Sequence, residues 1–140
     1  ITKPELDQMY IDFQLDKVRH AYATGLSGGQ QQRLNILLAV AHNPEVLLLD
    51  ELSTGLDVES KTRMKAFVKD YLAKHNSTMI LVSHNPDEIE LLCDRVITIH
   101  GGKIYEDLTM TEIKKKGFKR FEDYVDDLFT VRFKKEEADR

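Results

Sequence analysis

The feature that most limits the possible folds is an apolar run, residues 46–49, that ends in two acidic residues, Asp50 and Glu51. A second apolar run of strand length covers residues 78–82. Runs of this kind, without polar alternation, are typical of strands buried on both faces of a parallel sheet. Between them, over residues 58–74, apolar side chains recur at helical spacing. We therefore expect a β-α-β unit and an α/β fold with a mostly parallel core.

The best-defined helix is expected over residues 27–42. Ser27 is a good N-cap, and Gln30 stands three residues later, at the spacing of a capping box. Residues 43–44, Asn-Pro, end the pattern. The side chains expected on its apolar face are Leu34, Leu37, Leu38 and Ala41.

The last third of the chain has a different pattern. Residues 95–100 are expected to form another strand. A turn at Gly101-Gly102 would join it to a return strand over residues 103–106. Residues 107–140 combine dense charge with scattered apolar residues and predict one or two helices packed against the domain. The final segment, residues 132–140, is almost wholly charged, and we expect it to be frayed.

Composition excludes several classes of protein. With 20 Lys+Arg against 24 Asp+Glu, the net charge of −4 gives no electrostatic case for a nucleic-acid partner. Cys93 is the only cysteine, so an internal disulfide is impossible, which suits a reducing compartment. No apolar run approaches the roughly 20 residues that cross a bilayer.

A Gly-rich turn precedes the helix at Ser27. The N–H groups at a helix N-terminus and the positive end of the helix dipole attract anions. Gly28 and Gly29 would let a phosphate approach without a Cβ in the way, and the Ser27 hydroxyl could donate to it. The simpler interpretation is a serine N-cap with glycines for the turn.

The order of motifs along the chain decides between these interpretations. Leu-Ser-Gly-Gly-Gln at residues 26–30 precedes the acidic strand end at 50–51, Ser-Thr-Gly-Leu-Asp at 53–57, and Ser-His at 83–84. This series closely resembles the ATP-binding cassette (ABC) ATPases over roughly residues 20–105. The resemblance implies a P-loop NTPase-like parallel sheet flanked by helices, with part of a helical subdomain at the N-terminus.

The resemblance also implies roles for these residues on ATP. The family's signature sequence contacts the γ-phosphate of ATP bound to the opposite subunit of a head-to-tail dimer. Here its residues are Ser27, Gly28, Gly29 and Gln30. The Walker B motif matches Asp50, which would hold Mg²⁺, in part through water, and Glu51, which would orient or deprotonate the attacking water.

Two further motifs complete the implied site. The D-loop, which couples the two ATP sites across the dimer, matches Ser53, Gly55 and Asp57. Asp57 could equally cap the helix that follows it, and both roles can hold together. His84 matches the switch histidine, which contacts the γ-phosphate and can donate a hydrogen bond in either protonation state.

One essential part of the family is missing from the sequence. The phosphate loop requires Gly-x4-Gly-Lys-Ser/Thr, and the only Gly-Lys pair, residues 102–103, is followed by Ile104. The family's glutamine loop is also missing. We therefore expect the C-terminal part of a nucleotide-binding domain, incomplete as a fold and with little ATPase activity alone. The first residue, Ile1, suggests a fragment or a processed chain.

The resemblance predicts three segments and a set of partners. Residues 1–43 would be a helical subdomain remnant with the signature helix, 44–107 the catalytic core, and 108–140 a C-terminal helical tail. The expected partners are a second nucleotide-binding domain and a transmembrane permease, with no nucleic acid. The expected location is the cytoplasmic face of the cell membrane, reached through that permease.

Two alternatives stay open. A soluble ABC-type ATPase of translation or DNA maintenance would share the motifs, although the chain has neither a basic patch nor coiled-coil heptads between them. A non-catalytic cassette could only complete a partner's ATP site through residues 27–30. The intact Glu51 argues against that reading, since a purely structural half has no need of that carboxylate. The transported substrate and the direction of transport are not readable.

Overall fold

The computed structural model describes residues 1–138, and the chain divides into two compact units, Ile1–Ser83 and His84–Arg140. We describe each unit by itself. Both combine helices and strands, as the α/β prediction requires.

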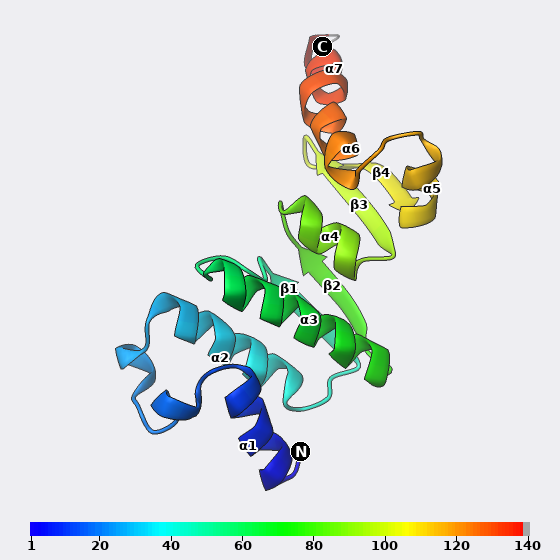
Figure 1. Ribbon diagram of the computed structural model, residues 1–140. Coiled ribbons are helices and arrows are strands. Elements are labelled where there is room, and N and C mark those ends of the chain that lie inside the picture. The colour runs from blue at the N-terminus through cyan, green and yellow to red at the C-terminus, as the bar shows by residue number, and fades with distance from the viewer. Residues whose placement is uncertain (139–140) are drawn as a thin grey trace. The chain divides into compact units, whose positions relative to one another are not determined.

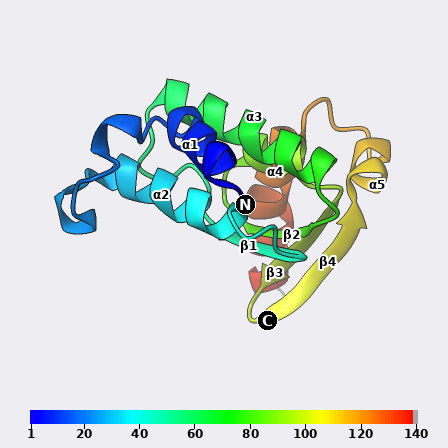
Figure 2. The ribbon, with the colours of Figure 1, turned by 90° about the horizontal axis from the view of Figure 1, so that it is seen from below.

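The first unit contains the predicted β-α-β motif. Its strands are parallel and in register from Val46↔Thr78 to Asp50↔Val82. The elements, in chain order, are α1 (Lys3–Asp12), η1 (Asp16–Val18), η2 (Ala23–Gly25), α2 (Gly28–Val40), β1 (Val46–Asp50), α3 (Val58–Lys74) and β2 (Thr78–Val82). The predicted helices at 27–42 and 58–74 are confirmed as α2 and α3, which lie side by side (Figures 1 and 2).

Apolar side chains from helices and sheet form the core of this unit. Leu37 of α2, Leu47 of β1 and Met64 of α3 are each no more than 2% exposed. Phe13, which follows α1, is fully buried and meets the Phe67 ring edge-on at 4.5 Å between centroids. The signature-like turn and the acidic strand end are thus both anchored to one packed core.

The apolar runs predict strands that are buried on both faces, but one face of each strand is exposed. Leu47 and Leu49 are buried, whereas Val46 and Leu48 on the opposite face are 55% and 69% exposed. On β2, Ile80 and Val82 are likewise more than half exposed. Side chains alternate across a strand, and this sheet of two strands is covered on one face within the unit. The apolar runs therefore fit a sheet with more cover than this unit supplies.

The apolar face of α2 also differs from the prediction at one position. Leu38 is 54% exposed, and the buried residues of the helix are Ile36, Leu37 and Val40. A helix advances 100° per residue, so the buried stripe through positions 36, 37 and 40 leaves position 38 on the outer side.

The second unit begins with a short helix and a hairpin. Strands β3 and β4 pair antiparallel through the Gly101-Gly102 turn, whose φ angles are 58° and 74°. The predicted hairpin is confirmed, and among the described residues β3 pairs only with β4, in antiparallel orientation. The elements are α4 (Pro86–Leu92), β3 (Arg95–His100), β4 (Lys103–Thr109), α5 (Met110–Lys115), α6 (Phe121–Asp127), the π-helical η3 (Leu128–Arg132) and α7 (Phe133–Ala138).

The C-terminal segment is more helical than the sequence predicts. α6, η3 and α7 follow one another without a break (Figure 1). The prediction of fraying from residue 132 is wrong up to Ala138, and residues 139–140 lie outside the described residues. Phe133, which is 6% exposed, stacks on the His100 ring at 3.9 Å between centroids. Aromatic packing and not charge therefore decides the start of α7. The buried cluster of this unit comprises Met110, Ile113, Phe121, Tyr124, Leu128 and Phe133.

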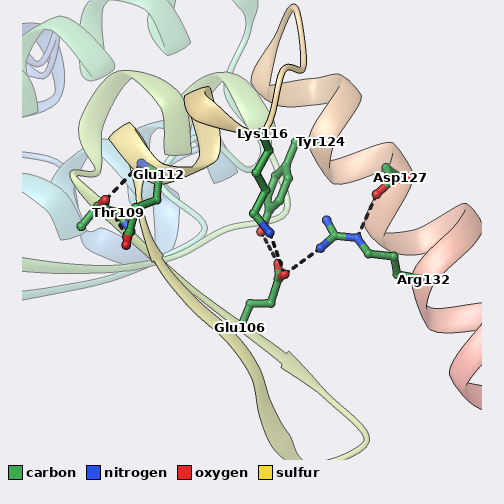
Figure 3. Close-up of polar contacts among 7 residues, drawn as sticks. All are labelled: Glu106, Thr109, Glu112, Lys116, Tyr124, Asp127 and Arg132. Carbon is green, nitrogen blue, oxygen red and sulfur yellow. Dashed lines mark hydrogen bonds and ion pairs between the residues drawn. The ribbon is translucent and has the colours of Figure 1, made fainter.

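A polar group, which we call the Glu106 cluster, lies beside these apolar residues and comprises Glu106, Lys116, Tyr124 and Arg132. The Glu106 carboxylate accepts hydrogen bonds from Lys116 Nζ at 3.0 Å, Tyr124 OH at 2.7 Å and an Arg132 guanidinium nitrogen at 2.8 Å (Figure 3). Burial raises the pKa of Glu106, but the three donors outweigh it and the pKa lies below its usual range. Burial, and then the neighbouring carboxylate, raise the pKa of Tyr124 to about 12.

Candidate functional site

The signature-like residues form the N-terminus of α2. Ser27 Oγ accepts from the Gln30 amide at 3.3 Å, and Gln30 Oε1 accepts from the Ser27 amide at 2.9 Å. The predicted capping box is thus confirmed. Because Ser27 Oγ is the acceptor of the hydrogen bond from the Gln30 amide, that bond does not use the hydroxyl hydrogen of Ser27. A Cβ placed on Gly28 would meet nothing within 4 Å, so the helix end is open to an anion at this position.

The acidic strand end lies at the carboxyl edge of the parallel pair. Asp50 is the last residue of β1 and is exposed, and its partner in register is Val82 of β2. Ligands of open α/β sheets bind at this edge. Glu51 follows with a φ of 52°, a left-handed conformation that is unusual for glutamate.

Several hydrogen bonds hold Glu51 in this conformation. Its amide donates to Val82 O at 2.8 Å, which extends the pairing with β2 by one bond. Its carboxylate accepts from Thr54 Oγ1 at 2.7 Å. Its carbonyl oxygen accepts from Gln32 Nε2 of α2 at 3.1 Å. The candidate catalytic carboxylate therefore sits on a backbone fixed from two other elements.

The D-loop-like residues turn the chain from β1 into α3. Ser53 is buried, and Gly55 has a φ of 74°. Asp57 caps α3 by accepting from the Ser60 amide and from the Ser60 hydroxyl, both at 2.9 Å. These two bonds, aided by the nearby charge of Arg33, hold the pKa of the Asp57 carboxyl below its usual value. The predicted capping role of Asp57 is confirmed.

The first unit brings the signature turn and the D-loop into contact. A Cβ on Gly29 would lie 3.3 Å from the carbonyl oxygen of Gly55, closer than an ordinary contact. Four residues along α2, an Arg33 guanidinium nitrogen donates to Ser60 Oγ at 3.0 Å. The absence of a side chain at position 29 thus permits the close approach of the two motifs.

Sequence reasoning missed the side chains that make these links: Gln32, Arg33 and Thr54. Gln32 and Arg33 lie three and four residues after Gly29, which places all three on one face of α2. The run of polar residues at 30–33, inside a helix that otherwise packs on the core, was the available signal. It could not specify the partners, because they lie about 20 or more residues later in the chain.

His84 is the first residue of the second unit, two residues after the end of β2 and just before α4. Its side chain is exposed. The neighbouring Asn85 caps α4 by accepting from the Asp87 amide at 3.0 Å. The role of His84 as a γ-phosphate contact stays a prediction.

A magnesium ion would find few protein ligands here. Among the described residues, no group of three or more His, Cys, Asp or Glu side chains is arranged to hold a metal ion. Mg²⁺ retains several waters and commonly takes only one or two carboxylates together with substrate phosphates. The exposed Asp50 at the sheet edge fits that limited share of the coordination.

Comparison with known proteins identifies the family. The ABC transporter family model matches residues 3–54. Over 87 residues the chain is 41% identical to the methionine import ATP-binding protein MetN 2 of Pectobacterium atrosepticum, a match that covers 62% of this chain and 26% of that protein. The chain is part of an ABC nucleotide-binding domain.

Two further comparisons agree with this assignment. The ABC chain is 40% identical over 88 residues to the aliphatic sulfonates import ATP-binding protein SsuB 2 of Nocardia farcinica, covering 63% of this chain and 37% of that one. A solved ATP-binding subunit of an ABC transporter has the same fold, with a TM-score of 0.76 and 21% identity, covering 90% of this chain and 55% of that structure. The matches thus span 26% and 37% of the length of these two curated relatives.

The ABC assignment raises the question of membrane contact. Among the residues that the structure describes, no helix is both long and apolar enough to span a bilayer.

Proposed function

We propose that this chain is the C-terminal part of the nucleotide-binding domain of a transporter ATPase, which binds and hydrolyses ATP and energises a membrane permease. One observation carries the proposal: the signature turn, the acidic strand end and the D-loop lie in contact within one unit. The links are the Gly29–Gly55 approach and the hydrogen bonds from Gln32 to the strand end. A chance match of short motifs would not require them to meet in space.

Each motif has a proposed role at the ATP site. Asp50 would share the coordination of Mg²⁺, which when bound neutralises charge on the β- and γ-phosphates. Glu51 would orient or deprotonate the attacking water. His84 would donate to the γ-phosphate. The D-loop residues Ser53, Gly55 and Asp57 would lie at the interface of the dimer. The signature residues, Ser27 to Gln30, would hold the γ-phosphate of ATP bound to the second subunit.

The uncovered sheet face supports the proposal that the domain has further parts. Val46, Leu48, Ile80 and Val82 present an apolar surface that water would otherwise contact. The phosphate loop, which the sequence of this chain lacks, would belong to such a part. We propose that the 140 residues alone neither bind ATP tightly nor hydrolyse it.

The names of the relatives favour an importer, since the two quoted above carry import of methionine and of aliphatic sulfonates in their names. We propose a location at the cytoplasmic face of the membrane, with a permease and a second nucleotide-binding domain as partners. Reconstitution of the full-length protein with its permease in vesicles, with uptake of labelled candidate solutes, tests the direction.

Substitution of the proposed base tests the proposed chemistry. In the full-length protein, Glu51→Gln should retain ATP binding but lower the hydrolysis rate by about 100-fold or more, because the amide cannot accept a proton. The matched control is Glu59→Gln, an exposed glutamate on α3 that pairs with Arg63. Steady-state phosphate release and nucleotide binding are measured for both. Hydrolysis at the parental rate in Glu51→Gln would remove Glu51 from the mechanism.

A further inference from the structure

We infer that Gln32 is a positioning residue, which fixes the backbone of Glu51 and thereby links the signature helix to the carboxylate proposed to act on ATP. The inference rests on the proposed function, because it assigns Gln32 to the same reaction. Gln32 lies outside the signature pentapeptide, two residues further along α2.

The contacts of the Gln32 side chain carry the inference. Its Nε2 donates to Glu51 O at 3.1 Å and to Leu52 O at 3.3 Å. These are consecutive carbonyl groups directly after β1, where the strand ladder has ended. Leu52 itself is only 1% exposed, so its backbone lies against the core, where an unpaired carbonyl is costly. One amide thus satisfies two acceptors at the point where the chain leaves the sheet.

The conformation of Glu51 explains why such support is needed. A left-handed conformation is strained for a residue with a side chain, and it persists only when surrounding contacts determine it. The φ of 52° at Glu51 directs the carboxylate, since the side chain turns with the backbone. The hydrogen bond from the Glu51 amide to Val82 O holds the N-terminal side of this residue, and the hydrogen bond from Gln32 holds its carbonyl group. Without Gln32, the Glu51 carbonyl would lose a 3.1 Å hydrogen bond and keep the longer one from the Thr54 amide at 3.4 Å, and the Leu52 carbonyl would lose a donor.

The same link connects two ATP sites of the proposed dimer. Gln32 is one helical turn from Gly29, which belongs to the turn proposed to contact ATP on the second subunit. Glu51 would act on ATP bound to its own subunit. A displacement of α2 on contact with the second ATP would therefore act on Glu51 through one side chain. Rate and not ATP affinity is the quantity that Gln32 should control.

Two variants of the full-length protein separate the donor from the shape of the side chain. Gln32→Met keeps the length and removes the donor, whereas Gln32→Lys keeps a donor for both carbonyls. We expect Gln32→Met to lower kcat about 10-fold while KM for ATP changes less than about 2-fold, and Gln32→Lys to recover most of the rate. Amide hydrogen exchange at residues 51–54 should become faster in Gln32→Met and stay near the parental rate in Gln32→Lys.

The matched control is Gln8→Met, which removes an exposed amide that donates to Asp12 on α1. It should leave kcat and exchange at residues 51–54 unchanged. A kcat within 2-fold of the parent in Gln32→Met would overturn the inference, as would equal loss in the Met and Lys variants. If either variant folds poorly, the exchange pattern of the other still decides. Loss of turnover in Glu51→Gln without loss in Gln32→Met would remove this inference and leave the proposed function intact.

Discussion

The polar contacts of the two units differ in what they fix. Around the motifs of the first unit, side chains bond mainly to the backbone: Gln32 to two carbonyls, Ser27 and Asp57 to helix amides. In the Glu106 cluster of the second unit, charged and phenolic side chains bond to one another. Backbone-directed bonds determine the conformation of short turns, whereas the Glu106 cluster holds helices to a hairpin. We expect changes in the first group to affect turnover and changes in the second to affect stability.

We expect the largest effect at Glu51, where a substitution should lower the rate of ATP turnover and leave the free energy of unfolding almost unchanged. Glu51→Gln should lower ATP turnover about 100-fold or more. It should change the free energy of unfolding by less than about 1 kcal/mol, because Gln can still accept from Thr54. Thermal unfolding of the full-length protein, monitored beside the rate assay, checks this. A large loss of stability in this variant would contradict the division between the two regions.

At Glu106 we expect the opposite outcome. Glu106→Gln removes the negative charge that faces Lys116 and Arg132, and should reduce the free energy of unfolding of its unit by about 3 kcal/mol. ATP turnover by the full-length protein should stay within about 2-fold of the parent. Urea unfolding followed by tyrosine fluorescence measures the stability. The control is Glu122→Gln, whose ion pair with Arg120 is exposed and should contribute little.

Lowering the pH should remove the stabilisation that the Glu106 carboxylate provides. The folded pKa of Glu106 lies below the ordinary glutamate value of about 4.3. Its stabilisation is therefore complete above that value and is lost as the pH falls through the folded pKa. The stability difference between the parent and Glu106→Gln should shrink as the pH is lowered from 6 to below 4. A difference that stays constant over this range would show that Glu106 does not titrate as described.

The smallest expected effect is at Tyr124. Tyr124→Phe keeps the ring in the buried cluster and removes only the hydroxyl that donates to Glu106 at 2.7 Å. The expected loss is about 1.5 kcal/mol, since Lys116 and Arg132 still pair with the carboxylate. Urea unfolding at pH 7 measures it. A loss as large as that of Glu106→Gln would mean that the hydrogen bond from the Tyr124 hydroxyl, and not the pairing of charge with Lys116 and Arg132, dominates the cluster.

The sequence predicted local elements of the first unit well because their signals are local. The capping box at Ser27 and the cap at Asp57 each follow from residues within one element or its border. The parallel pairing follows from the order of two apolar runs with a helical pattern between them. The sequence could not show what covers the second face of each strand, because an apolar run reflects the cover that a whole domain provides. The exposed Leu48 shows the difference.

The links between motifs were not predictable from the sequence. Gln32 and Thr54 carry ordinary amide and hydroxyl groups, and only the fold decides which carbonyl or carboxylate they reach. In the second unit, the charge-rich segment predicted a frayed end, but aromatic packing of Phe133 extends the helix. Charge density is a weak guide to order when apolar side chains recur among the charges.

We propose that this chain supplies the signature, the acidic strand end and the D-loop of an ATP site, while the phosphate loop comes from elsewhere. Binding and hydrolysis of Mg-ATP, measured on the 140-residue chain beside the full-length protein, test it most directly, with circular dichroism to establish that both are folded. We expect tight binding and turnover from the full-length protein only. Hydrolysis by the folded 140-residue chain, abolished by Glu51→Gln, would contradict it and place a phosphate site within these residues.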